Sequence, residues 1–137
     1  MSSLLIIIPA WNEEQALPKV LDEIRGNTEL DADVVVVDDG SSDRTSDAAR
    51  GNGVAVLTLP LNLGVGGAMR TGYLYAKRNG YERAVQVDAD GQHRPADILR
   101  LMARMDETNA DLIIGARFAG VGDYTVHGPR AWAMKVL

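Results

Sequence analysis

The chain has 137 residues, 46% of them hydrophobic, which is enough for one compact domain with a core. Its formal net charge of -5 argues against a nucleic-acid-binding protein, because such proteins usually carry a basic surface. The absence of cysteine excludes disulfides, zinc–thiolate sites and cysteine nucleophiles, and it fits a reducing compartment such as the cytoplasm.

The apolar run near the N-terminus predicts a buried strand over residues 4–8. It does not have the pattern of a signal peptide, because no basic residue precedes it and Pro9 ends it early. A helix is expected over 12–26, with Asn12 as its cap and Pro18 close enough to the start to be tolerated. No segment approaches the ~20 apolar residues that span a bilayer, so the chain is expected to be soluble or peripheral.

The alternation of strand and helix continues to residue 117. Ser42 or Asp43 could cap the second helix, and Pro95 stands at the first position of the fourth. A helical pattern that begins within 128–137 stops abruptly, which suggests a chain truncated at its C-terminus. Further strands are predicted over 33–43 (running into a turn), 54–59, 83–88 and 110–117, and further helices over 44–52, 62–80 and 94–107.

The strands are continuous runs rich in β-branched residues, without alternation of polar and apolar positions. This pattern is typical of a mostly parallel sheet covered by helices on both faces, as in Rossmann-like α/β folds. Ligands of such sheets bind beyond the carboxyl ends of the strands, which lie at one edge. The segments expected at that edge are rich in acids, glycines and amides: PAWNE, DDGSSD, NLGVGG, DADGQ and GARF.

Two acids follow the fourth predicted strand. Asp88 and Asp90 would point the same way in extended backbone, and two like charges so close are unfavourable without a partner. A divalent cation such as Mg²⁺ or Mn²⁺ would supply the missing charge. Gln92, two residues further on, offers a neutral oxygen that would point the same way. The alternative is a solvated turn, since this acid spacing is common. His93 is expected at the surface or in contact with the metal ligands, and less as a ligand itself.

A second acidic strand end contains Asp38 and Asp39, which should point to opposite sides because they are adjacent. One would contact a ligand, accepting hydrogen bonds from a nucleobase or from ribose hydroxyls, while the other orders the following turn. The alternative is that this acidic turn only caps the next helix.

The glycine-rich stretch before the predicted helix 62–80 does not have the spacing of a dinucleotide-binding fingerprint. Its glycines, Gly64, Gly66 and Gly67, would let the backbone approach a ligand, and Arg70 could meet a phosphate one turn into the helix. A tight turn before an amphipathic helix explains the same residues. Arg117 and Arg130 are further candidates for phosphate contacts, with surface salt bridges as the alternative.

Together these stretches resemble the family two glycosyltransferases, which have the GT-A fold. The resemblance is closest to the dolichyl- or polyprenyl-phosphate mannosyl- and glucosyltransferases, and it implies one catalytic, nucleotide-sugar-binding domain over residues 1–137. It depends on five segments in the family's order: IIIPAWNEEQALPKVL, DVVVVDDGSSDRT, LNLGVGGAMRTGY, VQVDADGQHRPADI and LIIGARF.

The resemblance also implies roles for individual residues. Those expected to bind the nucleobase and ribose are Pro9, Ala10, Trp11, Glu13 and Asp38 or Asp39. Those expected at the ribose and diphosphate are Asp88, Ala89 and Asp90. Those expected to hold Mg²⁺ or Mn²⁺ are Asp88, Asp90 and Gln92. The expected catalytic residues are Asp90, Arg117 and Arg130.

The implied reaction is an inverting transfer of a hexose from a donor of the GDP-mannose or UDP-glucose type to a polyprenyl or dolichyl phosphate. A lipid phosphate is already an anion near neutral pH, so it needs cations such as Arg117 and Arg130 for positioning and no general base. The resemblance further implies a membrane surface as a partner and a place in the cytoplasm or at the cytoplasmic membrane face. Trp132 and Met134 would suit such an interface.

Three other functions compete with this interpretation. A sugar hydroxyl could be the acceptor, or the chain could be a nucleotide-binding module without catalysis. A phosphatase of the haloacid-dehalogenase type is the third. The position two residues after Asp38 is Gly40, which lacks the second carboxylate of that motif, and the pair Asp88 and Asp90 lacks the threonine that should follow it.

Overall fold

The computed structural model describes residues 2–115. The chain divides into two compact units, Met1–Arg100 and Leu101–Leu137, and the whole sheet belongs to the first. A single catalytic domain over residues 1–137 stays a prediction. The elements are β1 (Leu4–Ala10), α1 (Leu17–Gly26), β2 (Asp33–Asp38), α2 (Thr45–Gly51), β3 (Ala55–Thr58), α3 (Gly64–Arg78), β4 (Arg83–Gln86) and α4 (Pro95–Thr108).

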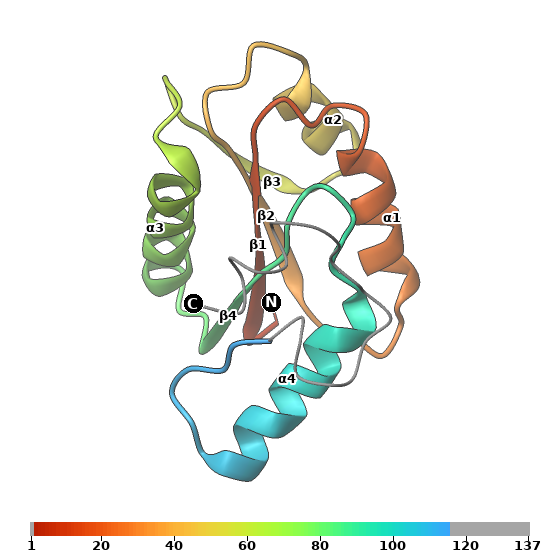
Figure 1. The fold of residues 1–137 in the computed structure, drawn as a ribbon, viewed down its shortest axis with the longest axis vertical. Helices are drawn as coiled ribbons and strands as arrows, with labels where there is room; N and C mark the ends of the chain where they lie inside the picture. Colours follow the sequence, from red (N-terminus) through yellow and green to blue (C-terminus); the bar gives the residue numbers. More distant parts are fainter. Residues whose placement is uncertain (1, 116–137) are drawn as a thin grey trace, which may run out of the picture. The chain divides into compact units, whose positions relative to one another are not determined.

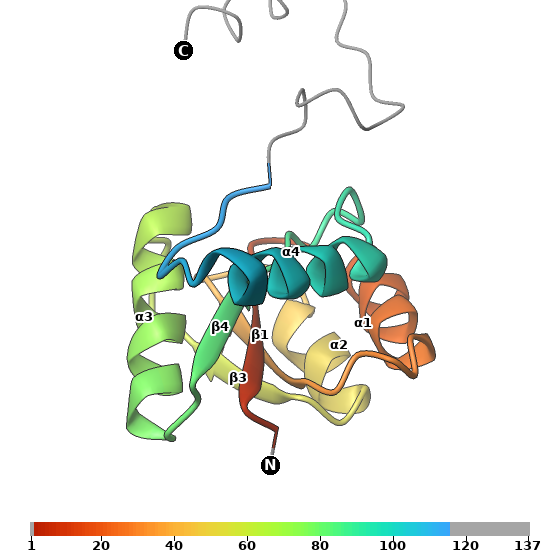
Figure 2. The same cartoon turned by 90° about the horizontal axis from the view of Figure 1, so that it is seen from below.

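The sheet has four parallel strands in the order β3-β2-β1-β4. Figures 1 and 2 show α3 on one face of this sheet and α1 with α2 on the other. β1 is buried along nearly its whole length, as its unbroken apolar sequence requires. The predicted parallel sheet with helices on both faces is therefore confirmed.

Alternate side chains of the strands supply the two halves of the core. Leu5 and Ile7 of β1 pack with Val35 and Val37 of β2 against α3. The packing on this side is close, because a Cβ added at Gly72 of α3 would overlap the Cγ2 atom of Ile7. The helix on the opposite face, α1, buries an apolar stripe of its own: Leu17, Val20, Leu21 and Ile24.

The strand order creates a crevice at one end of the sheet. The chain runs from β1 outward to β2 and β3 and then returns to place β4 on the other side of β1. The strand order therefore reverses at β1, and such a switch point is where ligands bind in open α/β sheets. Pairing of β1 and β4 extends beyond the strand bounds, since Val87 N donates to Ile7 O at 3.0 Å.

Helix α1 begins at Leu17, so the predicted start at residue 12 is wrong. Pro18 lacks a backbone N–H and is stable only in the first turn, which places the helix start next to it. Asn12 does not cap this helix; it has a positive φ of 54° and bonds to the loop after β2 instead.

The predicted fifth strand is also not formed over the part of 110–117 that the structure describes, residues 110–115. Leu112 and Ile114 are 74% and 80% exposed there. A β-branched run becomes a strand only when a neighbouring strand accepts its hydrogen bonds, and the described sheet ends at β4. Of the described helices, none has the length and apolar character needed to cross a bilayer.

Candidate functional site

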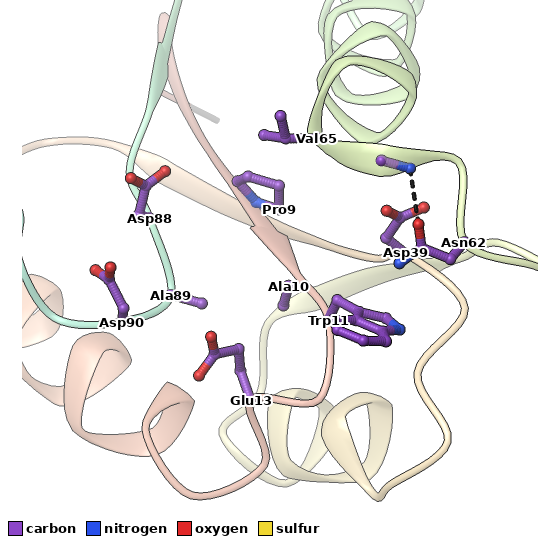
Figure 3. A pocket seen from close by; sticks show the side chains of 11 residues that line it. Pro9, Ala10, Trp11, Glu13, Asp39, Asn62, Val65, Asp88, Ala89 and Asp90 are labelled. Atoms are coloured by element: carbon purple, nitrogen blue, oxygen red, sulfur yellow. Dashed lines mark hydrogen bonds between the residues drawn. The ribbon is translucent and has the colours of Figure 1, made fainter. Parts of the chain in front are cut away.

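A cleft of about 650 Å³ opens at the carboxyl ends of β1, β2 and β4. Figure 3 shows side chains from these strand ends and from the start of α3 around it. The predicted site residues that line it are Pro9, Ala10, Trp11, Glu13, Asp39, Asp88, Ala89 and Asp90. The parallel topology thus brings together residues that are far apart in the sequence.

Four other predicted site residues lie in the described part of the chain but do not line the cleft: Asp38, Gly66, Arg70 and Gln92. Gly66 and Arg70 are exposed in the first half of α3. Gln92 is exposed, and its backbone N donates to Asp90 Oδ1 at 3.0 Å. Arg117 and Arg130 lie outside the described residues, as do Trp132 and Met134.

The adjacent acids at the end of β2, Asp38 and Asp39, have different contacts. Asp38 is 3% exposed and orders the turn that follows: its Oδ1 accepts from Ser41 N at 3.0 Å and its Oδ2 from the Ser46 hydroxyl. Asp39 points to the other side and lines the cleft. The predicted division between a turn-ordering acid and a ligand-facing acid corresponds to these two positions.

Asp39 also attaches the loop before α3 to the cleft. Its Oδ1 accepts from Leu63 N at 2.7 Å, so the carboxylate is held in one orientation. Gly40, with a φ of +70°, lies so close to this loop that an added Cβ would be 2.5 Å from Asn62 N. The close approach therefore needs a glycine at this position.

A network centred on Asn12 joins the loop after β1 to the loop after β2. Asn12 Oδ1 accepts from Ser42 N at 2.9 Å and from the Ser42 hydroxyl at 3.2 Å. Asn12 N donates to Ser41 Oγ at 2.9 Å, and Glu13 N donates to Thr45 Oγ1 at 3.0 Å. The two residues flanking Asn12, Trp11 and Glu13, line the cleft, so the network positions both.

The side chain of Glu13 lies in an acidic environment. Burial raises the pKa of its carboxyl group, and the nearby charges of Asp90 and Asp43 raise it further. The cleft therefore concentrates negative charge from two different strand ends. For Asp43, burial alone would raise the pKa, but hydrogen bonds from Thr45 and from Glu14 N outweigh it, and the pKa is lowered.

The segment after β4 holds Asp88 in place. Asp88 Oδ1 accepts from Gln86 Nε2 at 2.9 Å, and Asp88 N donates to His93 Nδ1 at 2.9 Å. His93 Nε2 lies 3.7 Å from Asp88 Oδ2. β4 ends at Gln86, and Ala89 and Asp90 form a turn, so the extended backbone assumed for the two acids is wrong beyond the strand end.

Within residues 2–115 no group of three or more His, Cys, Asp or Glu side chains could hold a metal ion alone. Asp88 and Asp90 still line the same cleft. This donor set suits a magnesium-like ion, which usually takes one or two protein carboxylates and completes its shell with waters and substrate phosphates.

Sequence reasoning named Gly64 of the glycine-rich stretch but missed two other cleft residues, Asn62 and Val65. Asn62 Oδ1 accepts from Gly64 N at 3.0 Å and shapes the entry to α3. An amide followed two residues later by a glycine with positive φ is a detectable turn signal.

Comparisons with known proteins give a family match and similar relatives for this chain. Residues 5–134 match the family described as "Glycosyl transferase family 2". The undecaprenyl-phosphate mannosyltransferase of Micrococcus luteus is 40% identical over 119 residues, covering 83% of this chain and 48% of that protein. The polyprenol monophosphomannose synthase of Mycolicibacterium smegmatis is 35% identical over 124 residues, covering 86% of this chain and 46% of that protein.

A solved structure is similar as well. The mannosyltransferase PcManGT from Pyrobaculum calidifontis, in complex with GDP-Man and Mn²⁺, superimposes with a TM-score of 0.56 at 28% identity. The alignment covers 64% of this chain and 27% of that one. The chain spans about half the length of the two curated relatives named above.

Proposed function

The chain belongs to glycosyl transferase family 2, and we propose that residues 1–137 are the nucleotide-sugar-binding catalytic domain of a hexosyltransferase. The reaction is transfer of a hexose from a nucleotide sugar to a polyprenyl or dolichyl phosphate. The names of the relatives, an undecaprenyl-phosphate mannosyltransferase and a polyprenol monophosphomannose synthase, support this acceptor. The observation that carries the proposal is the cleft in which Trp11, Asp39 and Asp88 meet.

The nucleoside would bind at the ends of β1 and β2. Trp11 lines the cleft and is 55% exposed, so its ring offers a face on which a base can stack. The Asp39 carboxylate, held by Leu63 N, can accept a hydrogen bond from a base N–H or a ribose hydroxyl. Both groups are oriented before a ligand arrives, which lowers the entropic cost of binding.

The diphosphate would bind between the acids of β4 and the start of α3. Asp88 and Asp90 would hold Mg²⁺ or Mn²⁺, with Gln92 as a further oxygen donor from the neighbouring turn. When bound, the ion would neutralise the charge that develops on the leaving nucleoside diphosphate. The Mn²⁺ in the mannosyltransferase complex and the acidic surroundings of Glu13 both support a cation here.

The acceptor needs positioning and no general base, because a lipid phosphate is an anion near neutral pH. We assign this positioning to Arg117 and Arg130 on the family resemblance, with Asp90 as the catalytic carboxylate. An attack from the side opposite the leaving group would invert the sugar configuration. The donor is of the GDP-mannose or UDP-glucose type, and GDP-Man in the related complex favours the first.

The phosphatase alternative gains no support from Asp38, one of its two candidate nucleophiles. That carboxylate is 3% exposed and bonded to Ser41 and Ser46. A buried acid that orders a turn cannot reach a substrate phosphate.

The proposal is tested by thermal unfolding of the chain with GDP or UDP, with and without Mn²⁺. We expect one nucleotide to raise the unfolding temperature, and Mn²⁺ to increase that rise.

Asp90→Asn should abolish the metal-dependent part of the shift. Asp31→Asn is a matched control, since Asp31 is exposed at the other edge of the sheet. Equal shifts in the wild type and in Asp90→Asn would refute the metal assignment, and nucleotide binding without hexose transfer by the full-length protein would favour the binding module.

A further inference from the structure

Positive charge is concentrated on one helix of an otherwise acidic chain. The chain has 19 acidic and 14 basic residues, yet no acidic residue occurs between Asp47 and Glu82, the stretch that contains α3. Within α3, Arg70, Lys77 and Arg78 are exposed. None of the three forms an ion pair with another residue within 2–115. Their charge therefore stays available for an external anion.

These cations share one face of the helix with apolar side chains. Tyr73 and Leu74 are each 48% exposed. The positions recur at intervals of three and four residues, so they form one face, which we call the basic face: Arg70, Tyr73, Leu74, Lys77 and Arg78. The opposite face, with Ala68, Met69 and Ala76, is buried in the core.

The loop that leads into α3 adds exposed apolar residues. Leu61 and Leu63 of this loop are 60% and 54% exposed, and Val65 in the first turn of α3 is 60% exposed. Gly64 and Val65 also line the cleft, so the start of α3 is continuous with the candidate donor site. Figure 3 shows Asn62 of this loop and Val65 of the first turn of the helix at the cleft. Exposed apolar residues in such a group indicate an interaction surface.

We propose that the basic face of α3, with the apolar residues of the preceding loop, docks on an anionic phospholipid bilayer. Basic side chains are attracted to the negative surface potential of such a membrane, and tyrosine and leucine fit the boundary between headgroups and acyl chains. The inference rests on the proposed function at one point, because a polyprenyl phosphate acceptor is itself a membrane lipid. Docking along α3 would place the bilayer beside the cleft that this acceptor must reach.

The test is flotation of the 137-residue chain with vesicles, without nucleotide or acceptor. We expect binding to vesicles of phosphatidylcholine with phosphatidylglycerol, little binding to phosphatidylcholine alone, and loss of binding at high salt. Each cation near such a surface contributes about fivefold in affinity, so Lys77→Gln with Arg78→Gln should weaken binding about 25-fold.

The matched control is Lys19→Gln with Arg44→Gln, which changes the net charge equally at side chains 83% and 81% exposed. It should bind as the wild type does. A second pair, Tyr73→Ser with Leu74→Ser, should weaken binding while leaving its salt dependence in place.

Three results would overturn the proposal: equal loss in both charge variants, equal binding to neutral vesicles, or a basic face that instead mediates self-association in sedimentation experiments. The outcome is independent of the donor site. If vesicle binding fails while nucleotide still raises the unfolding temperature, only the docking surface is refuted. If vesicles bind but no nucleotide does, the hexosyltransferase proposal fails and the surface remains.

Discussion

At the scale of single residues, Asn12 shows how a side chain outside the cleft can determine its shape. Its oxygen accepts hydrogen bonds from the loop after β2, and its φ of 54° lies in the left-handed region that asparagine tolerates better than most residues. Trp11 and Glu13 stand on either side of it in the cleft wall. The residue thus fixes the relation between two strand ends.

Asn12→Ala should therefore lower both stability and nucleotide affinity. Alanine loses the acceptor and is strained by about 1–2 kcal/mol at this φ. Asn12→Gly is the control, because it removes the acceptor without that strain. We expect calorimetric nucleotide affinity to fall in both variants, and the unfolding temperature to fall further in the alanine variant. Wild-type affinity in Asn12→Gly would show that the network does not position the cleft.

Glu13 is a second residue whose environment predicts a measurable effect. Its folded-state pKa is raised above the usual 4.5, first by burial and then by Asp90 and Asp43. A raised folded-state pKa means that the folded state binds this proton more tightly than the unfolded chain does. The free energy of unfolding therefore falls as the pH rises from the usual glutamate pKa through the folded-state pKa. Glu13→Gln should be more stable than the wild type at neutral pH and equal to it below the usual glutamate pKa. Thermal unfolding across this pH range compares the two proteins. If their unfolding temperatures differ by the same amount at every pH, the ionisation of Glu13 is not the cause.

At the scale of elements, the contact between Gly40 and the loop before α3 joins β2 to the start of the helix. Gly40→Ala would place a Cβ against the backbone of Leu61 and Asn62. Gly53 is a matched control, because its φ of +74° is similar but nothing lies within 4 Å of an added Cβ. We expect Gly53→Ala to lose about 1–2 kcal/mol of unfolding free energy, and Gly40→Ala to lose more and to bind nucleotide less tightly. Equal losses in urea unfolding would mean that the loop moves away without cost.

The same scale shows what sequence reasoning could reach. Helix α4 was predicted to within a residue at each end, because its apolar period and Pro95 are local signals. The gathering of Asp39, Asp88 and Trp11 at one edge follows from parallel topology and needed no distances. The start of α1 could have been predicted from Pro18, which is also a local signal. The pairing of Asn12 with Ser42 and the absence of a strand over 110–115 depend instead on partners distant in sequence. Local patterns do not contain that information.

At the scale of the first unit, the two edges of the sheet have different properties. The carboxyl edge carries the cleft and its mutually repelling acids. The amino edge is tied together: Asp33 Oδ2 accepts from Tyr81 OH at 2.9 Å and from Ser2 N at 3.1 Å. These bonds join the beginnings of β1, β2 and β4. We therefore expect stability to be separable from ligand binding.

Tyr81 allows that separation to be measured. Burial and the hydrogen bond to Asp33 raise its pKa to about 12 from the usual 10.0. Because the folded-state pKa is raised, its contribution to stability is complete below the unfolded-state pKa and is lost as the pH rises from about 10 toward 12. Tyr81→Phe should lose about 1 kcal/mol of unfolding free energy at neutral pH. In urea unfolding, the free energy of unfolding of this variant should fall less than that of the wild type as the pH rises above about 10. Its nucleotide affinity should stay at the wild-type value, since Tyr81 lies at the amino edge; a parallel fall in affinity would mean that the two edges are coupled through the sheet.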